Sequence, residues 1–230
     1  MRGENRIAVI IPALNEEAAI PLVLAAIPPW VDEVVVVDNG STDATPAVAR
    51  ELGARVVREP QRGYGAACLA GIEALQHPDL VVFLDGDFSD HPEEMDRLVD
   101  PLAAHRADLV IGSRVLGHRQ PGALTPQARF GNWLACLLIR LFWQVTCTDL
   151  GPFRAVRFSA LGGLNMEDRN YGWTVEMQIK AARAGLRSRE VPVRYRRRIG
   201  QSKVTGTLSG TVKAGTRILF VIVRSFFSRS

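Results

Sequence analysis

Five short apolar runs divide the first half of the chain, and a polar segment with a helical pattern separates each from the next. These runs are continuously apolar rather than alternating, which is typical of strands covered on both faces of a parallel sheet. Alternating strands and helices predict an α/β fold with a Rossmann-like, mainly parallel sheet flanked by helices. The five runs occupy residues 6–12, 33–38, 54–59, 80–85 and 108–113.

The segments between these runs carry signals for helix starts. Asn15 is expected to cap a first helix, with Glu16 and Glu17 in its first turn, where carboxylates favour the positive end of the helix dipole. The later helices are expected to begin at Thr42 or Asp43, after the glycine-containing turn 62–65, and at Pro92.

The pattern changes after residue 113. Residues 115–128 are polar and contain Gly and Pro, which predicts a loop. Residues 129–146 place apolar side chains at helical spacing. We expect two more strands at 151–158 and 188–195, a helix at 172–185 and a last amphipathic helix at 209–227 with Lys213, Arg217 and Arg224 near one face.

The net charge of +4 hides a strong asymmetry between the two halves of the chain. Residues 1–100 hold 7 Lys/Arg and 18 Asp/Glu, whereas residues 101–230 hold 28−7=21 basic and 24−18=6 acidic residues. An acidic half could hold a cation, and a basic half would attract a phosphorylated partner or an anionic membrane surface.

Other bulk features narrow the class of protein. The 3 cysteines are widely spaced without a CxxC pair, so we expect a reducing compartment and neither a disulfide framework nor a zinc site. The start of the chain lacks a signal-peptide pattern, and no apolar run is long enough for a membrane-spanning helix.

The most informative stretch is VVFLDGDFSDHPEEM, residues 81–95, where an apolar run leads directly into a cluster of acidic residues. Ligands of such sheets bind outside the carboxyl ends of the strands, where Asp38 and Asp85 are expected. Gly86 allows the carboxylates of Asp85 and Asp87 to converge, an arrangement that suits Mg²⁺ or Mn²⁺ carrying a diphosphate. The alternative is an acidic loop before a helix, and Glu93 and Glu94 belong to that helix start in either case.

Two common nucleotide-binding motifs do not fit. GYGAAC at 63–68 is only part of the GxGxxG motif and follows the third strand rather than the first, so it fails as a dinucleotide fingerprint. The chain contains no GxxxxGK[ST] motif, which excludes a P-loop.

Five motifs nevertheless occur in an informative order: VIIPALNEE, VVVVDNGSTDAT, GYGAA, VVFLDGDFSDHPEE and VIGSR. With these motifs, residues 6–205 resemble the family 2 glycosyltransferases, which have the GT-A fold. The resemblance implies that Asp38 contacts the nucleotide base, that Asp85 lies beside the ribose and diphosphate, and that Asp87 holds the divalent metal. It further implies Asp85 and Ser89 as metal ligands, and Pro12, Leu14, Glu16, Asn39, Arg62, Gly65 and Gly86 as the remaining donor-binding residues.

The second half resembles the polyprenyl-phosphate branch of that family, the dolichyl-phosphate mannose and glucose synthases. The motifs are DLGPFRAVR (149–157), YGWTVEMQIKAARAGLRSREVPV (171–193) and RRRIGQSKVTG (196–206). Relatives that act on hydroxyl groups carry a Glu-Asp pair as general base, at positions where this chain has Trp173 and Thr174. A hydroxyl nucleophile needs such a base, but a phosphate oxygen is already anionic and needs cations to position it.

The candidate acceptor-phosphate ligands are therefore basic side chains of the second half. Spacing to Gly200 makes Arg197 the first choice and Arg198 the second. If 194–198 is a strand, alternation sends Arg197 to the face opposite its neighbours. Asp149 either contacts the acceptor or caps a strand, and with Asp87 and Arg114 it completes the expected catalytic set. The full set of acceptor-phosphate candidates is Arg114, Arg154, Arg197, Arg198 and Lys203.

The resemblance predicts an inverting, metal-dependent enzyme that transfers a hexose from a UDP- or GDP-sugar to a polyprenyl phosphate. We expect a catalytic domain at 1–205, with a nucleotide-binding half (1–113) and an acceptor-binding half (114–205). The C-terminal segment 206–230 and the helix 129–146 are expected to associate with the membrane, which makes the enzyme cytoplasmic and peripheral on the cytoplasmic face.

Two alternatives are open at this point. The first is a soluble family 2 transferase that acts on a saccharide or small-molecule hydroxyl, with Asp149 or Asp168 as base. The second is a basic membrane- or nucleic-acid-binding protein without catalysis. We expect no nucleic-acid partner, because no RRM, OB or helix-turn-helix signal appears and aromatic residues are not interleaved with the basic run.

Overall fold

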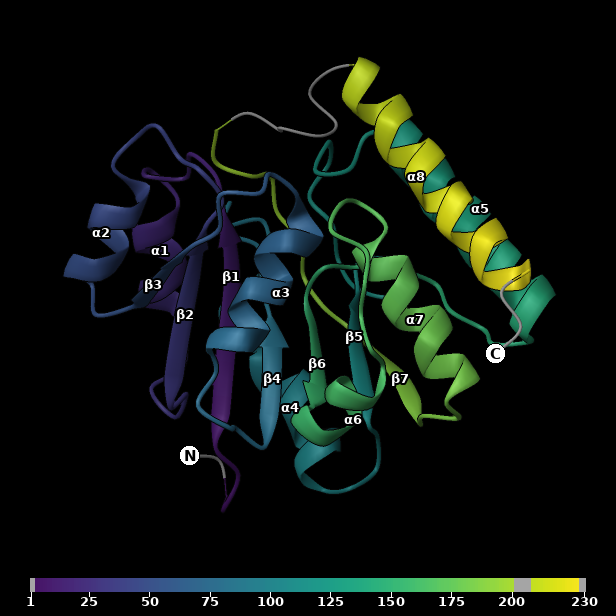
Figure 1. The fold of residues 1–230 in the computed structure, drawn as a ribbon, viewed down its shortest axis with the longest axis horizontal. Coiled ribbons are helices and arrows are strands. Elements are labelled where there is room, and N and C mark those ends of the chain that lie inside the picture. The colour runs from purple at the N-terminus through teal and green to yellow at the C-terminus, as the bar shows by residue number, and fades with distance from the viewer. Residues whose placement is uncertain (1–2, 201–207, 228–230) are drawn as a thin grey trace.

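A seven-stranded sheet forms the centre of the computed structural model, which describes residues 3–200 and 208–227 (Figure 1). Its strand order is β3-β2-β1-β4-β6-β5-β7. β6 runs antiparallel to both of its neighbours, and all other pairs are parallel. The strands are β1 (Ile7–Ala13), β2 (Glu33–Asp38), β3 (Arg55–Arg58), β4 (Leu80–Phe83), β5 (Leu109–Ser113), β6 (Arg154–Arg157) and β7 (Ser188–Pro192).

Helices cover both faces of the sheet. One face packs against α1 (Ile20–Ala26), α2 (Thr45–Glu51) and α4 (Met95–Ala103), the last preceded by the 3₁₀ turn η1 (Pro92–Glu94). The other face packs against α3 (Tyr64–Ala74), α6 (Phe158–Gly163) and α7 (Trp173–Arg183). An outer layer of two long helices, α5 (Pro126–Trp143) and α8 (Leu208–Phe227), packs on α7.

The continuous apolar strands are explained by this two-sided packing. In β1, Val9 and Ile11 join the core on one face, while Ala8 and Ile10 join the core on the other. All four side chains are fully buried, so polar residues are excluded from both faces of this strand. The predicted mainly parallel α/β sheet is confirmed.

The start of the first helix differs from the prediction. Asn15 does not cap it: the helix begins at Ile20 with Pro21 in its first turn, and Asn15 has a φ of 53°. The Asn15 Oδ1 instead accepts a hydrogen bond from the Thr42 backbone N–H at 2.8 Å. Glu16 and Glu17 therefore lie in a loop at the strand ends rather than in a helical turn.

The outer layer brings distant parts of the chain together. α8 lies along α5 in Figure 1, and Val221 and Ile222 of α8 pack in one cluster with Ala135 and Ile139 of α5. None of the helices in the described part of the chain is both long enough and apolar enough to cross a membrane.

The edge strand β7 is held by an ion pair at its start. The Asp108 carboxylate accepts hydrogen bonds from the Arg187 backbone N–H (3.0 Å), Nε (2.9 Å) and Nη2 (2.8 Å). The hydrogen bonds from the Arg187 side chain are the main cause that lowers the pKa of Asp108 from 3.8 to about 2. This carboxylate therefore stabilises the fold while it is ionised.

The substitution Asp108→Asn tests this contribution. A lowered folded-state pKa stabilises the protein above the unfolded value of 3.8, and the effect is lost as the pH falls towards 2. We expect the variant to be less stable than the native chain at neutral pH, with a difference that shrinks as the solution is acidified below 3.8. Urea unfolding across this pH range measures the difference, and a constant gap would contradict the assignment.

Candidate active site

A cavity of about 610 Å³, here called the strand-end pocket, opens at the carboxyl ends of β1, β2 and β4. Its position is that of ligand sites in parallel α/β sheets. The structure brings most of the predicted donor-binding residues together here. Those that line the pocket are Pro12, Leu14, Glu16, Asn39, Arg62, Asp85, Gly86 and Asp87.

The acidic turn after β4 forms the floor of this pocket. Asp87 Oδ1 accepts a hydrogen bond from the Ser89 backbone N–H at 2.9 Å, and its Oδ2 lies 3.0 Å from Arg198 Nη1. Asp85 Oδ1 is buried and makes no hydrogen bond within the described residues. Burial, followed by the charge of Asp87, raises the pKa of Asp85 from 3.8 to about 7. Both effects disfavour the ionised form of Asp85, and a positive charge nearby would favour it.

The two carboxylates fit a divalent cation only if other groups complete its coordination. Among the described residues, no cluster of three or more His, Cys, Asp or Glu side chains could hold a metal ion. Mg²⁺ and Mn²⁺ are commonly bound by one or two carboxylates together with phosphate oxygens. Asp85 and Asp87 meet that requirement, whereas the fully buried Ser89 lies outside the pocket lining and supports Asp87 through its backbone.

Asn39 explains why this chain has DNGS after β2. Its Nδ2 donates hydrogen bonds to the backbone carbonyls of Glu59 (3.1 Å) and Gln61 (2.7 Å), and its Oδ1 accepts one from Gly63 N–H at 2.8 Å. An aspartate here could accept from Gly63 but could not donate to either carbonyl. The amide thus holds the loop that carries Arg62 against the pocket.

Gly65 and Asp38 shape the pocket from behind and do not line it. A Cβ on Gly65 would lie 1.9 Å from the Asp168 backbone oxygen, so this glycine permits close approach of the loop before α7. Asp38 is buried, and its Oδ1 accepts a hydrogen bond from Ser41 N–H at 2.8 Å. The roles in donor binding that the sequence suggested for both residues stay predictions.

A second cavity, the helix cleft, adjoins the strand-end pocket. It has a volume of about 290 Å³ and shares Tyr64, Asp85, Tyr171 and Arg198 with the first cavity. The basic side chains among its described lining residues are the predicted Arg114 and Arg198. Small residues of two helices, Ala128 and Gly131 of α5 and Ala214 and Gly215 of α8, form part of its wall.

Arg114 is held in the cleft by a buried carboxylate. Its Nε and Nη2 donate hydrogen bonds to the two oxygens of Asp149 at 2.8 and 2.7 Å, and its backbone N–H donates a third at 2.7 Å. Burial lowers the pKa of Arg114, but the Asp149 charge more than offsets this and leaves the pKa raised. Asp149 is fully buried, and its backbone N–H donates to Glu190 at 3.0 Å, so it positions Arg114 and is not free to act as a base.

The other predicted cations lie elsewhere. Arg154 is fully buried, and its guanidinium donates hydrogen bonds to the carbonyls of Leu150, Gly151 and Thr174, so its expected contact with an acceptor phosphate is wrong. Arg197 Nε donates to the Pro121 carbonyl at 2.8 Å, away from the cleft lining, which makes Arg198 the stronger candidate of the two. Lys203 lies outside the described residues.

The strand expected at 188–195 ends at Pro192, so residues 194–198 are not in a strand, although their side chains still divide between two sides as expected. Arg194 pairs with Glu94, Arg196 stacks 3.4 Å from the Phe88 ring centroid, and Arg198 pairs with Asp87, so all three reach towards the segment 87–94. Arg197 points to the opposite side.

Asp168 is not available as a general base, contrary to the alternative considered from the sequence. Its Oδ1 accepts hydrogen bonds from the backbone N–H groups of Asn170 and Gly172, and its Oδ2 lies 2.7 Å from Arg217 Nε of α8. The side chain is buried and lines neither cavity.

Residues 8–163 match the sequence profile of glycosyl transferase family 2. The chain belongs to this family. It is 40% identical over 213 residues to an uncharacterized glycosyltransferase of Mycobacterium tuberculosis, which covers 91% of this chain and 94% of the relative. It is 34% identical to an undecaprenyl-phosphate mannosyltransferase of Micrococcus luteus, over 89% of this chain and 90% of the relative.

Solved glycosyltransferase structures share the fold of this chain. Glucosyl-3-phosphoglycerate synthase of Mycobacterium tuberculosis, crystallised with Mn²⁺, UDP and glucosyl-3-phosphoglycerate, superposes with a TM-score of 0.79. That alignment covers 100% of this chain and 82% of the synthase at 25% identity. The predicted GT-A fold is confirmed.

The contribution of α8 to both cavities of this family 2 glycosyltransferase was not predicted from the sequence. Lys213 lines the strand-end pocket, and Ala214, Gly215 and Ile218 line the helix cleft. The basic face of α8 pointed to a functional role, but only the fold shows that this helix lines the two cavities.

The substitution Asp149→Asn tests the positioning role of Asp149. Loss of its charge should loosen Arg114 and lower kcat roughly a hundredfold, the typical effect of misplacing a group that orients substrate. Nucleotide affinity should stay unchanged, because Asp149 lies outside the strand-end pocket. Steady-state kinetics and nucleotide titration measure the two quantities.

Glu190→Gln is the companion variant, because Glu190 accepts the backbone N–H groups of Thr148 and Asp149. Glu190→Gln should lower kcat by a smaller factor than Asp149→Asn and leave nucleotide affinity unchanged. If Asp149 were instead a general base, its substitution would remove a limb of the pH–rate profile, an outcome that contradicts the positioning role.

Proposed function

We propose that this enzyme is an inverting glycosyltransferase that moves a hexose from a UDP- or GDP-sugar to the phosphate of a polyprenyl phosphate. The observation that carries the proposal is the make-up of the helix cleft. It presents the guanidinium groups of Arg114 and Arg198, and Asp85 is the one carboxylate among its described lining residues.

This charge pattern favours a phosphate acceptor over a hydroxyl. A hydroxyl group must lose its proton to a base, and Asp149 and Asp168 are both committed to arginine partners. A phosphate monoester is already anionic, so it needs only to be held near the donor sugar. Arg198 is suited to that task because it lines both cavities.

The walls of the cleft favour an acceptor with an isoprenoid chain. Its lining is apolar at Leu124, Ala128, Leu150 and Ile218. A Cβ added at Gly131 would meet no atom within 4 Å, so the space beside this residue is open. Such a lining stabilises an apolar chain by removing it from water. The undecaprenyl-phosphate mannosyltransferase of Micrococcus luteus supports the same acceptor class.

The strand-end pocket suits the nucleotide diphosphate and its metal. Asp87 and Asp85 would hold Mg²⁺ or Mn²⁺, which supplies positive charge to offset the diphosphate as it leaves. Arg62 and Lys213 line the same pocket and add charge of the same sign. The neighbouring synthase that was crystallised with Mn²⁺ and UDP supports this assignment.

The reaction is a single displacement. One oxygen of the acceptor phosphate attacks the anomeric carbon while the bond from that carbon to the diphosphate oxygen breaks. The electron pair of that bond leaves with the nucleoside diphosphate, and the configuration of the sugar inverts. Arg114 and Arg198 orient the attacking phosphate, and no protein base takes part.

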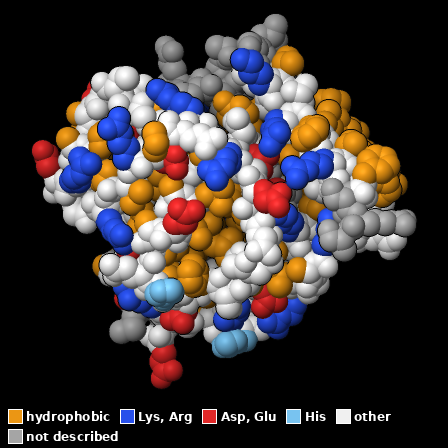
Figure 2. Space-filling model, viewed as in Figure 1, with side chains coloured by type: hydrophobic (Ala, Val, Ile, Leu, Met, Phe, Trp, Pro, Cys, Tyr) orange, Lys and Arg blue, Asp and Glu red, His pale blue; other side chains and the backbone are white. Residues whose placement is uncertain are grey.

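The outer helices favour a peripheral position at a membrane surface. Among the described residues, 14 large hydrophobic side chains are exposed, and the ten of these on α5 and α8 include Phe130, Trp133, Leu141 and Phe227. Figure 2 shows apolar side chains gathered at the edge of the molecule formed by these helices, with basic side chains beside them. This combination is typical of helices that lie in a lipid interface.

The first test supplies the purified enzyme with labelled UDP-glucose or GDP-mannose, polyprenyl phosphate and Mn²⁺. We expect a sugar-lipid product, and a lack of product with every common donor would overturn the lipid acceptor. Parallel reactions with 3-phosphoglycerate and with saccharides test the soluble alternative.

Asp87→Ala should abolish turnover, because it removes the carboxylate expected to hold the metal. It should also remove the Mn²⁺-dependent part of the thermal stabilisation by nucleotide. Glu93→Ala is the matched control from the same acidic segment: Glu93 lines neither cavity, so both properties should survive. Retained activity in the Asp87 variant would remove this residue from the metal site.

Gly131→Trp tests the path of the isoprenoid chain. The new side chain would fill the helix cleft, since the space around the Gly131 Cβ position is open. We expect KM for polyprenyl phosphate to rise roughly tenfold to a hundredfold, the range for overfilling a packed site, with nucleotide affinity unchanged. Gly162→Trp on α6 is the control, because its Cβ position is also open but lies outside both cavities.

A further inference from the structure

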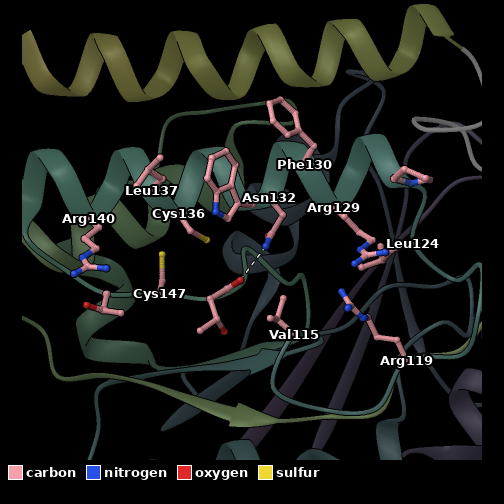
Figure 3. Close-up of a pocket in the computed structure, with 14 residues that line it drawn as sticks. Val115, Arg119, Leu124, Arg129, Phe130, Asn132, Cys136, Leu137, Arg140 and Cys147 are labelled. Atoms are coloured by element: carbon pink, nitrogen blue, oxygen red, sulfur yellow. Dashed lines mark hydrogen bonds between the residues drawn. The ribbon is translucent and has the colours of Figure 1, made fainter.

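A third cavity lies on the outer flank of α5, apart from the catalytic cavities. This arginine groove has a volume of about 660 Å³ and is formed by α5 together with segments 115–124 and 146–148 (Figure 3). It shares Leu124 and Asn132 with the helix cleft and none of its lining with the strand-end pocket. The proposed reaction makes no use of it.

Three arginines line the groove without protein partners. Arg119 and Arg129 approach each other at one end, and Arg140 lies at the other end (Figure 3). In the part of the chain that the structure describes, their guanidinium groups make no ion pair or hydrogen bond, and no Asp or Glu lines the groove. By contrast, Arg114, Arg187 and Arg198 each pair with a carboxylate. The groove therefore concentrates positive charge that an anion can offset.

Part of the remaining lining is apolar and exposed. Phe130, Trp133 and Leu137 are 60%, 56% and 44% exposed, and the rings of Phe130 and Trp133 are 5.8 Å apart. A free phosphate or an acidic peptide would leave these side chains in water. An anion joined to a hydrocarbon chain would cover them and meet the arginines at the same time.

We propose that the arginine groove binds an anionic phospholipid of the membrane surface. The headgroup phosphate lies between Arg119 and Arg129, and the acyl chains lie against Phe130, Trp133 and Leu137. Arg140 faces the next headgroup along the helix. Aromatic side chains at headgroup level and arginines that attract anionic lipid are the features that hold amphipathic helices in an interface.

This site fixes how the enzyme meets the membrane. α5 borders the arginine groove on one flank and the helix cleft on the other. A lipid bound in the groove therefore places the cleft next to the bilayer. The binding proposal stands independently of the acceptor proposal, because it concerns a separate cavity.

The first experiment uses short-chain phosphatidylglycerol below its micelle concentration and follows the tryptophan fluorescence of the full-length protein. We expect saturable binding, with a signal that Trp133→Phe largely removes. Glycerol phosphate and short-chain phosphatidylcholine, which lack the chains and the net charge respectively, should bind at least tenfold more weakly. Equal binding of glycerol phosphate would overturn the proposal in favour of a simple anion site.

The second experiment is flotation with phosphatidylcholine vesicles that contain or lack phosphatidylglycerol. Each basic residue near an anionic surface changes affinity by roughly fivefold, so the triple variant Arg119→Gln, Arg129→Gln, Arg140→Gln should lose about a hundredfold. The matched control removes the same charge at Arg50, Arg58 and Arg106, which are exposed on other elements.

The control should lose much less affinity than the groove variant. Equal losses, or vesicle binding without monomer binding, would mean that net charge alone attracts the protein, and either result overturns the site. Capture of a protein partner in place of lipid vesicles would do the same. Neither measurement requires turnover, so both give an answer whether or not the proposed acceptor is correct.

Discussion

The electrostatic constraint at the end of β4 governs the rest of this structure. Asp85 and Asp87 stand close together in a partly buried turn, and burial with mutual repulsion raises the pKa of Asp85 to about 7. The protein offsets this charge with Arg198, which arrives from more than a hundred residues later in the chain. A donor diphosphate with its metal brings both signs of charge into the same turn. A bound donor with its metal would therefore complete the charge balance of this turn, to which the second half of the chain contributes Arg198.

The outer helix α8 is coupled to this turn through a chain of direct contacts. Arg217 of α8 pairs with Asp168, whose loop packs on Gly63 and Gly65 at the edge of the strand-end pocket. Lys213 of the same helix lines that pocket. A helix that faces the outside with apolar side chains thus also lines the pocket proposed for the nucleotide. The ion pair of Arg217 with the buried Asp168 therefore links α8 directly to the loop before α7.

The sequence allowed prediction wherever the deciding interactions are local. The continuous apolar strands identified the sheet, because burial on both faces excludes polar residues at every position. The acidic turn could also be predicted locally, because Asp85 and Asp87 follow directly after a continuous apolar run. Predictions failed where a distant partner decides the outcome. Asn15 is a residue type that favours the N-cap of a helix, but its side chain instead accepts a hydrogen bond from Thr42 across the loop.

The arginines show this limit most clearly. Sequence spacing ranked Arg197 above Arg198, yet strand alternation alone could not say which face of the strand meets the acidic turn. Backbone hydrogen bonds made beyond the end of β7, from Arg196 N–H to Ser89 and from Ile199 N–H to Asp87, hold this segment against the acidic turn. Arg198 then meets Asp87, and Arg197 meets Pro121. Arg154 could not be excluded from sequence either, since its carbonyl partners at Leu150, Gly151 and Thr174 converge only in the fold.

The position of α5 links catalysis to the outer surface. Its small residues Ala128 and Gly131 line the helix cleft, where bulk would block the proposed acceptor. Phe130 and Trp133 are exposed beside arginines that pair with no side chain in the described part of the chain. A helix packed only for stability would not combine an open glycine wall on one flank with exposed aromatic side chains on the other. Both features make sense together if the acceptor enters from a bilayer against which the helix lies. The same helix then does two things, since it excludes water from the chain of the acceptor and sets the height of Arg114 and Arg198 relative to the headgroups.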